Sequence, residues 1–231
     1  MVIPRELHAR ELLDGPLAPA DLRATLDDLD RLNTWFGGYA LTLTRVRRVA
    51  RQLPADQRLV VVDVGGGRGD LAVCIVRWAR RVGRPVRVIV LDRDATMLAL
   101  ARRRTARFPE IALVCGDATA LPLRPGAADV AVAALTLHHM TPDDAAAALG
   151  AMSAAAPVVV VNDLLRTPTS LALVWLATRV FRLHPVSCHD GPVSVRRAYT
   201  AQELTALARR NGRDVRVRSY PLLGRLVAEV A

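Results

Sequence analysis

The chain has 231 residues, 52% of them hydrophobic, which suits one domain with a substantial core and a small appendage. Its formal net charge is +10, and all 32 basic residues are arginine. Because there is no lysine, the chain has neither a P-loop triplet nor the tyrosine–lysine pair on which some dehydrogenases rely, so both classes are excluded.

The arginines are spread over several helical segments and do not form one dedicated surface. Three groups stand out: Arg45, Arg47, Arg48 and Arg51; Arg77, Arg80, Arg81, Arg84 and Arg87; Arg102, Arg103, Arg104 and Arg107. The last two groups fall on segments expected to cover a sheet, toward the ends that face away from a ligand. Aromatic residues make up only 4% of the chain, so stacking platforms for bases are scarce. We therefore expect solvated helix faces and no nucleic-acid partner.

The cysteines and the first residues bear on the compartment. Cys74, Cys115 and Cys188 are far apart and form no CxxC motif, so we expect no disulfide framework, no zinc site and no other metal. Residues 1–16 carry five charged residues and no apolar run, so we expect no signal peptide. These features favour a reducing cytoplasm.

Two helices are predicted near the N-terminus. Residues 20–33 have leucines at helical spacing, with acidic residues and arginine on the other faces. A second helix is expected from Tyr39 to about Leu53, where Pro54 ends it.

The stretch Val-Val-Val-Asp-Val-Gly-Gly-Gly-Arg-Gly at residues 60–69 predicts a buried parallel strand followed by a tight turn. Gly65, Gly67 and Gly69 lack a Cβ, so the backbone can turn sharply and approach a ligand there. A helix should begin directly afterwards, with its free N–H groups facing that ligand. Asp92, 23 positions past Gly69, ends the next apolar run and suits a pair of ribose hydroxyls. The pattern predicts a doubly wound α/β domain that holds a nucleoside-containing cofactor.

Asp63 narrows the choice of cofactor. It lies at the strand end, two positions before Gly65. A carboxylate there attracts a cation and repels a pyrophosphate held at the helix N-terminus. S-adenosylmethionine carries an ammonium group and no phosphate, so Asp63 favours it over NAD or ATP.

Polar residues follow the remaining predicted strands, at 86–91, 111–115, 129–135 and 158–161. Asp117 and the Ala118 N–H could bind the edge of an adenine ring, and Met97 could lie on its face. His138 and His139 follow the fourth strand, and Asn162 follows the fifth. Open α/β sheets bind ligands at this carboxyl end.

The C-terminal third begins with an apolar segment, residues 170–181, expected to be helical and too short to span a bilayer. It is interpreted as a lid over an apolar substrate or, alternatively, as core packing or a dimer face. Residues 184–192, rich in proline, glycine and polar groups, predict a loop. Thr200 and Glu203 predict a capping box that starts a helix, and residues 213–220 and 225–230 supply two last strands.

The ordered motifs VVVDVGGGRGD, VIVLDRD, VCGDATALPL and VAVAALTLHHM resemble those of class I S-adenosylmethionine-dependent methyltransferases. Leu-His-His after the fourth strand is similar to ubiquinone and menaquinone biosynthesis methyltransferases and to small-molecule enzymes of bacterial natural-product pathways. The resemblance implies a mostly parallel, seven-stranded Rossmann-like sheet with helices on both faces. Arg68 departs from the small or hydroxyl residue of many relatives. The cofactor-binding residues implied are Asp63, Gly65, Gly67, Gly69, Asp92, Arg93, Met97, Asp117, Ala118 and Leu135.

The same resemblance implies a division of the chain. Residues 1–55 are expected to form an N-terminal helical cap, and residues 56–231 the cofactor-binding core, with a lid-like insertion at 164–198. The expected substrate-pocket residues are Trp35, Tyr39, His138 and Asn162.

Methyl transfer from a sulfonium needs alignment and, for a hydroxyl acceptor, removal of a proton, for which histidine is suited. We expect His189, oriented by Asp190, to be the base and His139 to shape the pocket beside the methyl group. The alternative is that these histidines only pack or bind backbone groups. The favoured function is O-methylation of a phenolic or polyketide-like small molecule. C-methylation of a quinone precursor, RNA methylation and a non-catalytic cofactor-binding role stay open, as does a homodimer.

Overall fold

A seven-stranded sheet forms the centre of the structure, a computed structural model that describes residues 2–230. The strand order is β3-β2-β1-β4-β5-β7-β6. The first five strands pair in parallel, and β7 is antiparallel to both of its neighbours, β5 and β6. The strands are β1 (Leu59–Val64), β2 (Val86–Asp92), β3 (Ile111–Cys115), β4 (Val130–Ala134), β5 (Val158–Leu164), β6 (Val215–Tyr220) and β7 (Arg225–Val230). The predicted fold class is confirmed.

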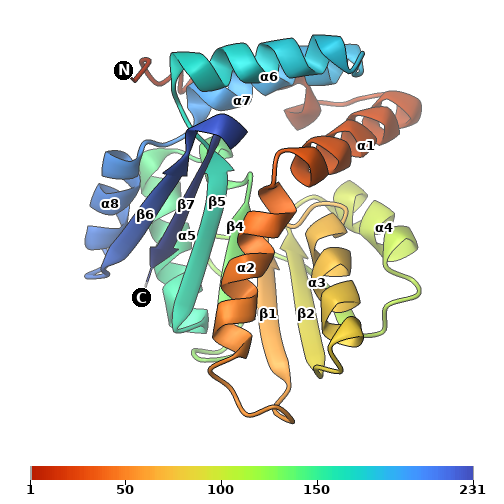
Figure 1. The fold of residues 1–231 in the computed structure, drawn as a ribbon, viewed down its shortest axis with the longest axis vertical. Coiled ribbons are helices and arrows are strands. Elements are labelled where there is room, and N and C mark those ends of the chain that lie inside the picture. The colour runs from red at the N-terminus through yellow and green to blue at the C-terminus, as the bar shows by residue number, and fades with distance from the viewer. Residues whose placement is uncertain (1, 231) are drawn as a thin grey trace.

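Helices cover both faces of the sheet (Figure 1). One face carries α2 (Gly38–Ala50) and α3 (Asp70–Arg81), and the other carries α5 (Pro142–Ala155) and α8 (Ala201–Arg209). The helix α4 (Ala95–Arg104) packs beside β2 and β3. Because both faces are covered, the central strands are apolar on both sides: in β1, Val61 packs toward α3 and Val62 toward α5.

A helical roof lies over the carboxyl ends of the parallel strands (Figure 1). It consists of a short 3-10 turn, η1 (Leu12–Asp14), and the helices α1 (Pro19–Trp35), α6 (Pro168–Val180) and α7 (Pro185–Arg197). Two further 3-10 turns, η2 (Leu137–His139) and η3 (Pro221–Leu223), lie at the same end. The roof therefore covers the edge of the sheet at which the sequence predicts ligand binding.

The predicted loop at 184–192 is wrong, because most of it is the first half of α7. His184 is the N-cap and Pro185 opens the helix, while Pro192 lies inside it. Glycine and proline are weak breakers here, because tertiary contacts hold the helix in place. Asp28 of α1 accepts hydrogen bonds from the His184 backbone N–H at 2.7 Å and the Ser187 hydroxyl at 2.9 Å. The insertion is thus a pair of helices.

The extent of β5 and the layer to which α2 belongs also differ from expectation. Asn162 and Asp163 lie inside β5, which continues to Leu164 and pairs with β7 from Val159 onward. The second N-terminal helix, α2, packs Val46 and Val49 against the sheet, so it belongs to the helical layer and not to the roof. The capping box at Thr200 and Glu203 is confirmed.

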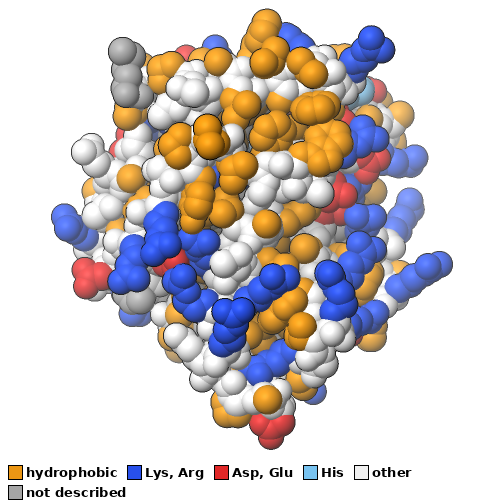
Figure 2. All heavy atoms as spheres, viewed as in Figure 1, with side chains coloured by type: hydrophobic (Ala, Val, Ile, Leu, Met, Phe, Trp, Pro, Cys, Tyr) orange, Lys and Arg blue, Asp and Glu red, His pale blue; other side chains and the backbone are white. Residues whose placement is uncertain are grey.

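The surface divides into an apolar and a basic part. Figure 2 shows apolar side chains gathered over the end that carries α6, and arginines spread over the lower half of the same view. Several large apolar side chains are exposed there: Trp35, Trp175, Leu176, Val180, Phe181 and Leu222. Among the described residues, no helix combines the length and the apolar character needed to cross a bilayer.

Candidate functional site

The glycine loop after β1 needs its glycines. Gly65, Gly67 and Gly69 have φ angles of 66°, 53° and 80°, in the left-handed region that disfavours other residues. A Cβ at Gly65 would collide with the Thr136 side chain, whereas one at Gly67 would meet nothing within 4 Å. The loop therefore packs tightly against the segment that follows β4 on one side and faces open space on the other.

Asp92 fixes the shape of this loop. Its Oδ2 accepts a hydrogen bond from the Gly67 N–H at 2.8 Å, and its Oδ1 accepts one from the Asp94 N–H at 2.9 Å. The carboxylate at the end of β2 is thereby held in one orientation beside the loop. Asp117 is held in a similar way, because its Oδ1 accepts from the Thr119 N–H and hydroxyl, both at 2.7 Å.

A cavity of about 520 Å³ lies between the carboxyl ends of the strands and the roof. Of the predicted cofactor-binding residues, Gly69 alone does not line it; Gly69 instead caps α3 and packs against Thr105. Gly66, Thr136 and Asp30 also line the cavity, without having been predicted. The predicted residues that line it are Asp63, Gly65, Gly67, Asp92, Arg93, Met97, Asp117, Ala118 and Leu135, with Tyr39 and His139.

Asp63 provides a test of whether the expected cofactor fits. Its side chain is 1% exposed, and its Oδ2 has no hydrogen-bond partner. Burial, together with the nearby carboxylates of Asp92 and Asp70, raises the pKa of Asp63 to about 7. A buried, unpartnered carboxylate oxygen in the cavity wall calls for a cationic donor. S-adenosylmethionine carries such a group, so the residues present fit it.

Arg68 ties the roof to the glycine loop. Its guanidinium contacts Asp27 of α1 at 2.6 Å and Asp70 of α3 at 2.9 Å, and it donates to the Leu26 carbonyl at 3.2 Å. The residue that departs from the motif of many relatives thus closes α1 over the large cavity. Sequence reasoning noted Arg68 as unusual but gave it no role.

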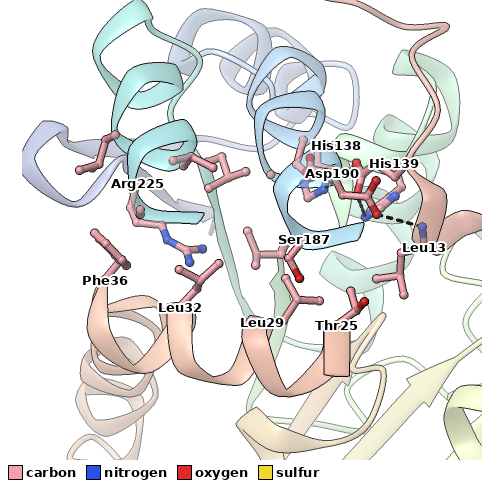
Figure 3. A pocket seen from close by; sticks show the side chains of 18 of the residues that line it. Leu13, Thr25, Leu29, Leu32, Phe36, His138, His139, Ser187, Asp190 and Arg225 are labelled. Carbon is pink, nitrogen blue, oxygen red and sulfur yellow. Dashed lines mark hydrogen bonds and ion pairs between the residues drawn. The ribbon is translucent and has the colours of Figure 1, made fainter. Parts of the chain in front are cut away.

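A second, narrower cavity of about 110 Å³ lies inside the roof, between α1, α6 and α7 (Figure 3). Most of its wall is apolar. It shares wall residues with the large cavity, so the two spaces adjoin. The shared residues are Leu13, Leu29, Leu135 and His139.

Leu135 stands at this shared wall in a strained conformation. Its φ angle is 55°, which is rare for a bulky residue and typical of sites where the surrounding structure holds the backbone. Its backbone N–H donates to the Asn162 carbonyl at 2.9 Å. This bond extends the hydrogen-bond ladder between β4 and β5 by one residue. The strain places the chain that follows, including both histidines, at the mouth between the cavities.

A cluster of histidines and carboxylates occupies one end of the narrow cavity. His138 Nδ1 lies 2.7 Å from Asp163 Oδ1, and its Nε2 lies 3.6 Å from Glu11 Oε1. His139 Nδ1 lies 3.2 Å from Asp14 Oδ1, and its Nε2 lies 3.9 Å from Glu11 Oε2. The Nε2 atoms of both rings therefore lie near Glu11. The Nδ1 atom of His138 lies near Asp163, and that of His139 lies near Asp14.

The electrostatics of the cluster follow from burial and pairing. Burial raises the pKa of Glu11 against the opposing effects of His139 and Arg197. Burial also opposes ionisation of Asp163, but the charge and hydrogen bond of His138 lower the pKa of Asp163 overall. An ionised Asp163 accepts the Nδ1–H of His138, which leaves His138 Nε2 as the atom facing Glu11.

Arg225 lies at the other end of the narrow cavity, beside Phe36 and Leu32 (Figure 3). It is buried, and burial lowers its pKa to about 10. Its Nη2 donates to Asn33 Oδ1 at 2.9 Å, while its Nε has no partner. A guanidinium with a free donor thus faces the histidine cluster across an apolar interior.

Besides Gly69, three predicted residues line neither cavity: His189, Trp35 and Asn162. His189 is exposed, and its Nδ1 lies 2.8 Å from Asp190 Oδ1. The Asp190 carboxylate does line the narrow cavity, but it also accepts the Leu12 and Leu13 N–H groups at 2.7 and 2.9 Å. Trp35 is 52% exposed and packs against Phe181 with the two rings tilted. Asn162 donates to the Gly38 carbonyl at 2.7 Å and to Thr42, linking β5 to α2.

The residues that sequence reasoning missed come from segments without a recognisable pattern. Glu11 and Asp14 lie before the first helix, and Arg197 and Arg225 come near the C-terminus. Arg197 reaches Asp14 at 3.0 Å and Glu11 at 3.5 Å. Of these residues, only Asp163 could have been predicted from the sequence, because it follows Asn162 at the end of an apolar run.

The comparisons with known proteins agree with this geometry. Residues 61–156 match the model of a family described as a methyltransferase domain. This stretch begins in β1 and ends just after α5, so it includes the glycine loop, Asp92, Asp117 and both histidines of the cluster.

Two curated relatives act in quinone pathways by name. The 2-phytyl-1,4-naphtoquinone methyltransferase of Thermosynechococcus vestitus is 42% identical over 73 residues, which cover 32% of this chain and 31% of the relative. The ubiquinone/menaquinone biosynthesis C-methyltransferase of Caulobacter vibrioides is 31% identical over 103 residues, covering 42% of this chain and 40% of the relative. The chain therefore spans less than half the length of these relatives.

Among solved structures, the CMeT domain of the citrinin polyketide synthase superposes with a TM-score of 0.64 at 13% identity. The match covers 83% of this chain and 51% of that one, and it shows a common fold. The family match, the glycine loop and the acidic strand ends agree, so residues 61–156 are similar to a methyltransferase domain in both sequence and site geometry.

Proposed function

We propose that the chain is a methyltransferase that transfers the methyl group of S-adenosylmethionine to a small, largely apolar molecule, most favourably to an oxygen of a phenolic or polyketide-like acceptor. The observation that carries the proposal is the shared wall of the two cavities. A polar cavity that fits the cofactor adjoins an apolar one at Leu135 and His139. Transfer by in-line displacement requires such adjoining sites, because the acceptor atom must lie next to the methyl group.

On the cofactor side, the ribose, the adenine ring and the ammonium group each have a candidate partner in the chain. Asp92 is oriented for the ribose hydroxyls, and Asp117 with the Ala118 N–H for the adenine edge. Asp63 offers its free oxygen to an ammonium group. S-adenosylmethionine, once bound, supplies the electrophilic methyl group, while the chain's own residues hold it and exclude water from the shared wall.

On the acceptor side, His189 is replaced by other residues as the group that accepts the proton. A phenolic hydroxyl must lose its proton as it is methylated, and His189 lies outside both cavities. The cluster of Glu11, His138 and His139 lies inside the narrow cavity, and His139 reaches the shared wall. We assign removal of the proton to this cluster.

Arg225 specifies a second feature of the acceptor. Its Nε is buried without a partner at the end of the cavity away from the histidines. An acceptor with a carbonyl or anionic oxygen at that end would satisfy it, with apolar rings between. A molecule with two oxygenated ends and an apolar middle fits better than a nucleotide, which is why RNA is not favoured.

C-methylation of a quinone precursor is the second candidate. The Caulobacter relative is a C-methyltransferase by name, and ionising a phenol also makes its ring carbons nucleophilic. The same cluster would serve both outcomes. Cytoplasmic location and a homodimer remain predictions of the sequence.

The test is to incubate the protein with methyl-labelled S-adenosylmethionine and a panel of phenols, quinone precursors, polyketides and tRNA. Label on an oxygen of a phenol or polyketide supports the first candidate, and label on a ring carbon supports the second. Label on tRNA alone would overturn the proposed substrate class. Cofactor binding by calorimetry without transfer to any member of the panel would favour the non-catalytic role.

A further inference from the structure

We infer that Glu11, His138 and His139 form a binding site for a first-row divalent cation, with Zn²⁺ as the ion whose chemistry the donor set matches best. The sequence predicted no metal, because its three cysteines are far apart and form no CxxC motif. The fold brings together one carboxylate from the N-terminal segment and two imidazoles from η2. The consequence for catalysis rests on the proposed function, but the test of binding does not.

The donor atoms are already near coordination distance of one another. His138 Nε2 and His139 Nε2 lie 3.6 and 3.9 Å from the two oxygens of Glu11, and all three donors lie within 4.8 Å of one another. Around a tetrahedral Zn²⁺ with bonds of about 2.0–2.1 Å, ligand atoms are roughly 3.3 Å apart. Small side-chain rotations would therefore close the site. Two histidines and one glutamate, with an open fourth position, form a donor set found in zinc enzymes.

The groups behind the ligands are arranged as in metal centres. Asp163 is hydrogen-bonded to the Nδ1 of His138 at 2.7 Å, and Asp14 lies 3.2 Å from the Nδ1 of His139 without hydrogen-bond geometry. A carboxylate on the far ring nitrogen fixes the tautomer that leaves Nε2 free to bind a metal and raises its basicity.

The charge of the cluster also calls for a cation. Three carboxylates, Glu11, Asp14 and Asp163, face the two imidazoles, and Arg197 is the cation that contacts them, at 3.0 Å from Asp14 and 3.5 Å from Glu11. The cluster thus holds three carboxyl groups against one contacting guanidinium. Glu11, Asp163 and His138 are buried, so water compensates unpaired charge there poorly. A divalent cation between the three ligands would supply a further positive partner.

The position of the site explains what it would do. All three ligands line the narrow cavity, and His139 also lines the cofactor cavity. The open coordination position would thus face the acceptor, whose oxygen could take it. A zinc ion lowers the pKa of a bound water to about 7, and it would favour the ionised form of a bound hydroxyl in the same way. Acceptors with an oxygen donor near the shared wall are the class it would select.

The test uses tag-free, metal-stripped full-length protein titrated with Co²⁺. We expect one equivalent to bind with the visible absorption of a four-coordinate site and to be displaced by Zn²⁺. Glu11→Gln and His139→Asn should each weaken binding by about 100-fold or more, and Asp163→Asn by about 10–100-fold, the usual effect of losing the partner of a ligating histidine. His189→Asn, which removes a histidine outside the cluster, should bind Co²⁺ as the wild type does.

Zinc-edge X-ray absorption on the loaded wild type, which needs no variant, should show two imidazoles among the ligands. Absence of stoichiometric binding, or equal binding by wild type, Glu11→Gln and His139→Asn, would overturn the inference. Binding of S-adenosylmethionine by each variant, measured in parallel by calorimetry, checks that the variant is folded. The same measurement on the wild type separates the two proposals: Co²⁺ binding without cofactor binding would contradict only the proposed function.

Discussion

The two adjoining cavities are built by different means. The cofactor cavity takes nearly all its predicted residues from loops at the ends of β1, β2 and β3, within a single stretch of the chain. The acceptor cavity draws on η1, α1, η2, α6, α7 and the start of β7, which are far apart in sequence. One cavity is fixed by the sheet, and the other by a roof laid on the sheet. The roof can therefore change with the acceptor while the cofactor site stays intact.

The two cavities also differ in the contacts that hold them in shape. In the cofactor cavity, Asp92 and Asp117 accept hydrogen bonds from backbone N–H groups of the loops at the strand ends. In the acceptor cavity, the corresponding bonds join separate elements: Asp28 of α1 accepts from the N-cap of α7, and Asp190 of α7 accepts from η1. We expect substitutions on the two sides to separate cofactor affinity from turnover.

The largest separation is expected at Glu11. Glu11→Gln removes the carboxylate that faces both histidines, so turnover should fall by about 10²–10⁴-fold, the usual contribution of a group that handles the acceptor proton. Cofactor affinity should stay within about twofold, because Glu11 does not line the cofactor cavity. Steady-state kinetics and calorimetry measure the two effects. A variant that loses both equally would contradict the separation.

The next effect concerns pH and Asp63. Because the pKa of Asp63 is raised from 3.8 to about 7, the folded protein binds a proton that the unfolded chain has released. This contribution to stability is fully present below about pH 4 and is lost as pH rises through 7; it amounts to about 4 kcal/mol. Denaturant unfolding of the ligand-free protein measures it. Asp63→Asn should flatten this part of the pH profile.

The same carboxylate should link cofactor binding to pH. A cationic group beside Asp63 binds its ionised form, so affinity for S-adenosylmethionine should rise between about pH 6 and 8. In Asp63→Asn the affinity should be weaker and nearly independent of pH over this range. An unchanged pH slope in the variant would mean that the free oxygen of Asp63 does not face the cofactor.

A smaller loss is expected at Asp92. Asp92→Ala removes the acceptor of the Gly67 and Asp94 N–H groups along with the contact to the ribose. Cofactor affinity should fall by about 1.5–3 kcal/mol, the cost of losing hydrogen bonds to a charged group. Calorimetry checks this value. If affinity is unchanged, the assignment of Asp92 to the ribose is wrong.

The smallest effect should come from the link between roof and loop. Arg68→Gln should cost about 1 kcal/mol of stability, because Asp27 is 59% exposed and Asp70 keeps its ion pair with Arg104. Amide exchange in α1 should nevertheless become faster, since Arg68 holds that helix over the loop. The matched control is Arg80→Gln, which breaks an exposed pair with Glu110 away from the roof and should leave exchange in α1 unchanged.

The sequence predicted the sheet, the cofactor residues and the capping box because each depends on local patterns: apolar runs, glycines with left-handed φ angles, and Thr200 with Glu203 three positions on. It failed for α7, where contacts from Asp28 and η1 outweigh the breaking tendency of Gly191 and Pro192. The acceptor site was beyond local patterns, because Glu11 meets His138 only when the roof folds onto the sheet.

The central claim is that two separate cavities meet at one wall, and labelled methyl transfer by Leu173→Trp tests it most directly. Leu173 lines only the acceptor cavity, whereas Leu176 on the same helix faces outward. Filling the cavity should reduce transfer by at least about tenfold while cofactor affinity stays within about twofold, and Leu176→Trp should change neither. If Leu173→Trp keeps full transfer, or loses cofactor binding to the same extent as transfer, the two-cavity account is contradicted.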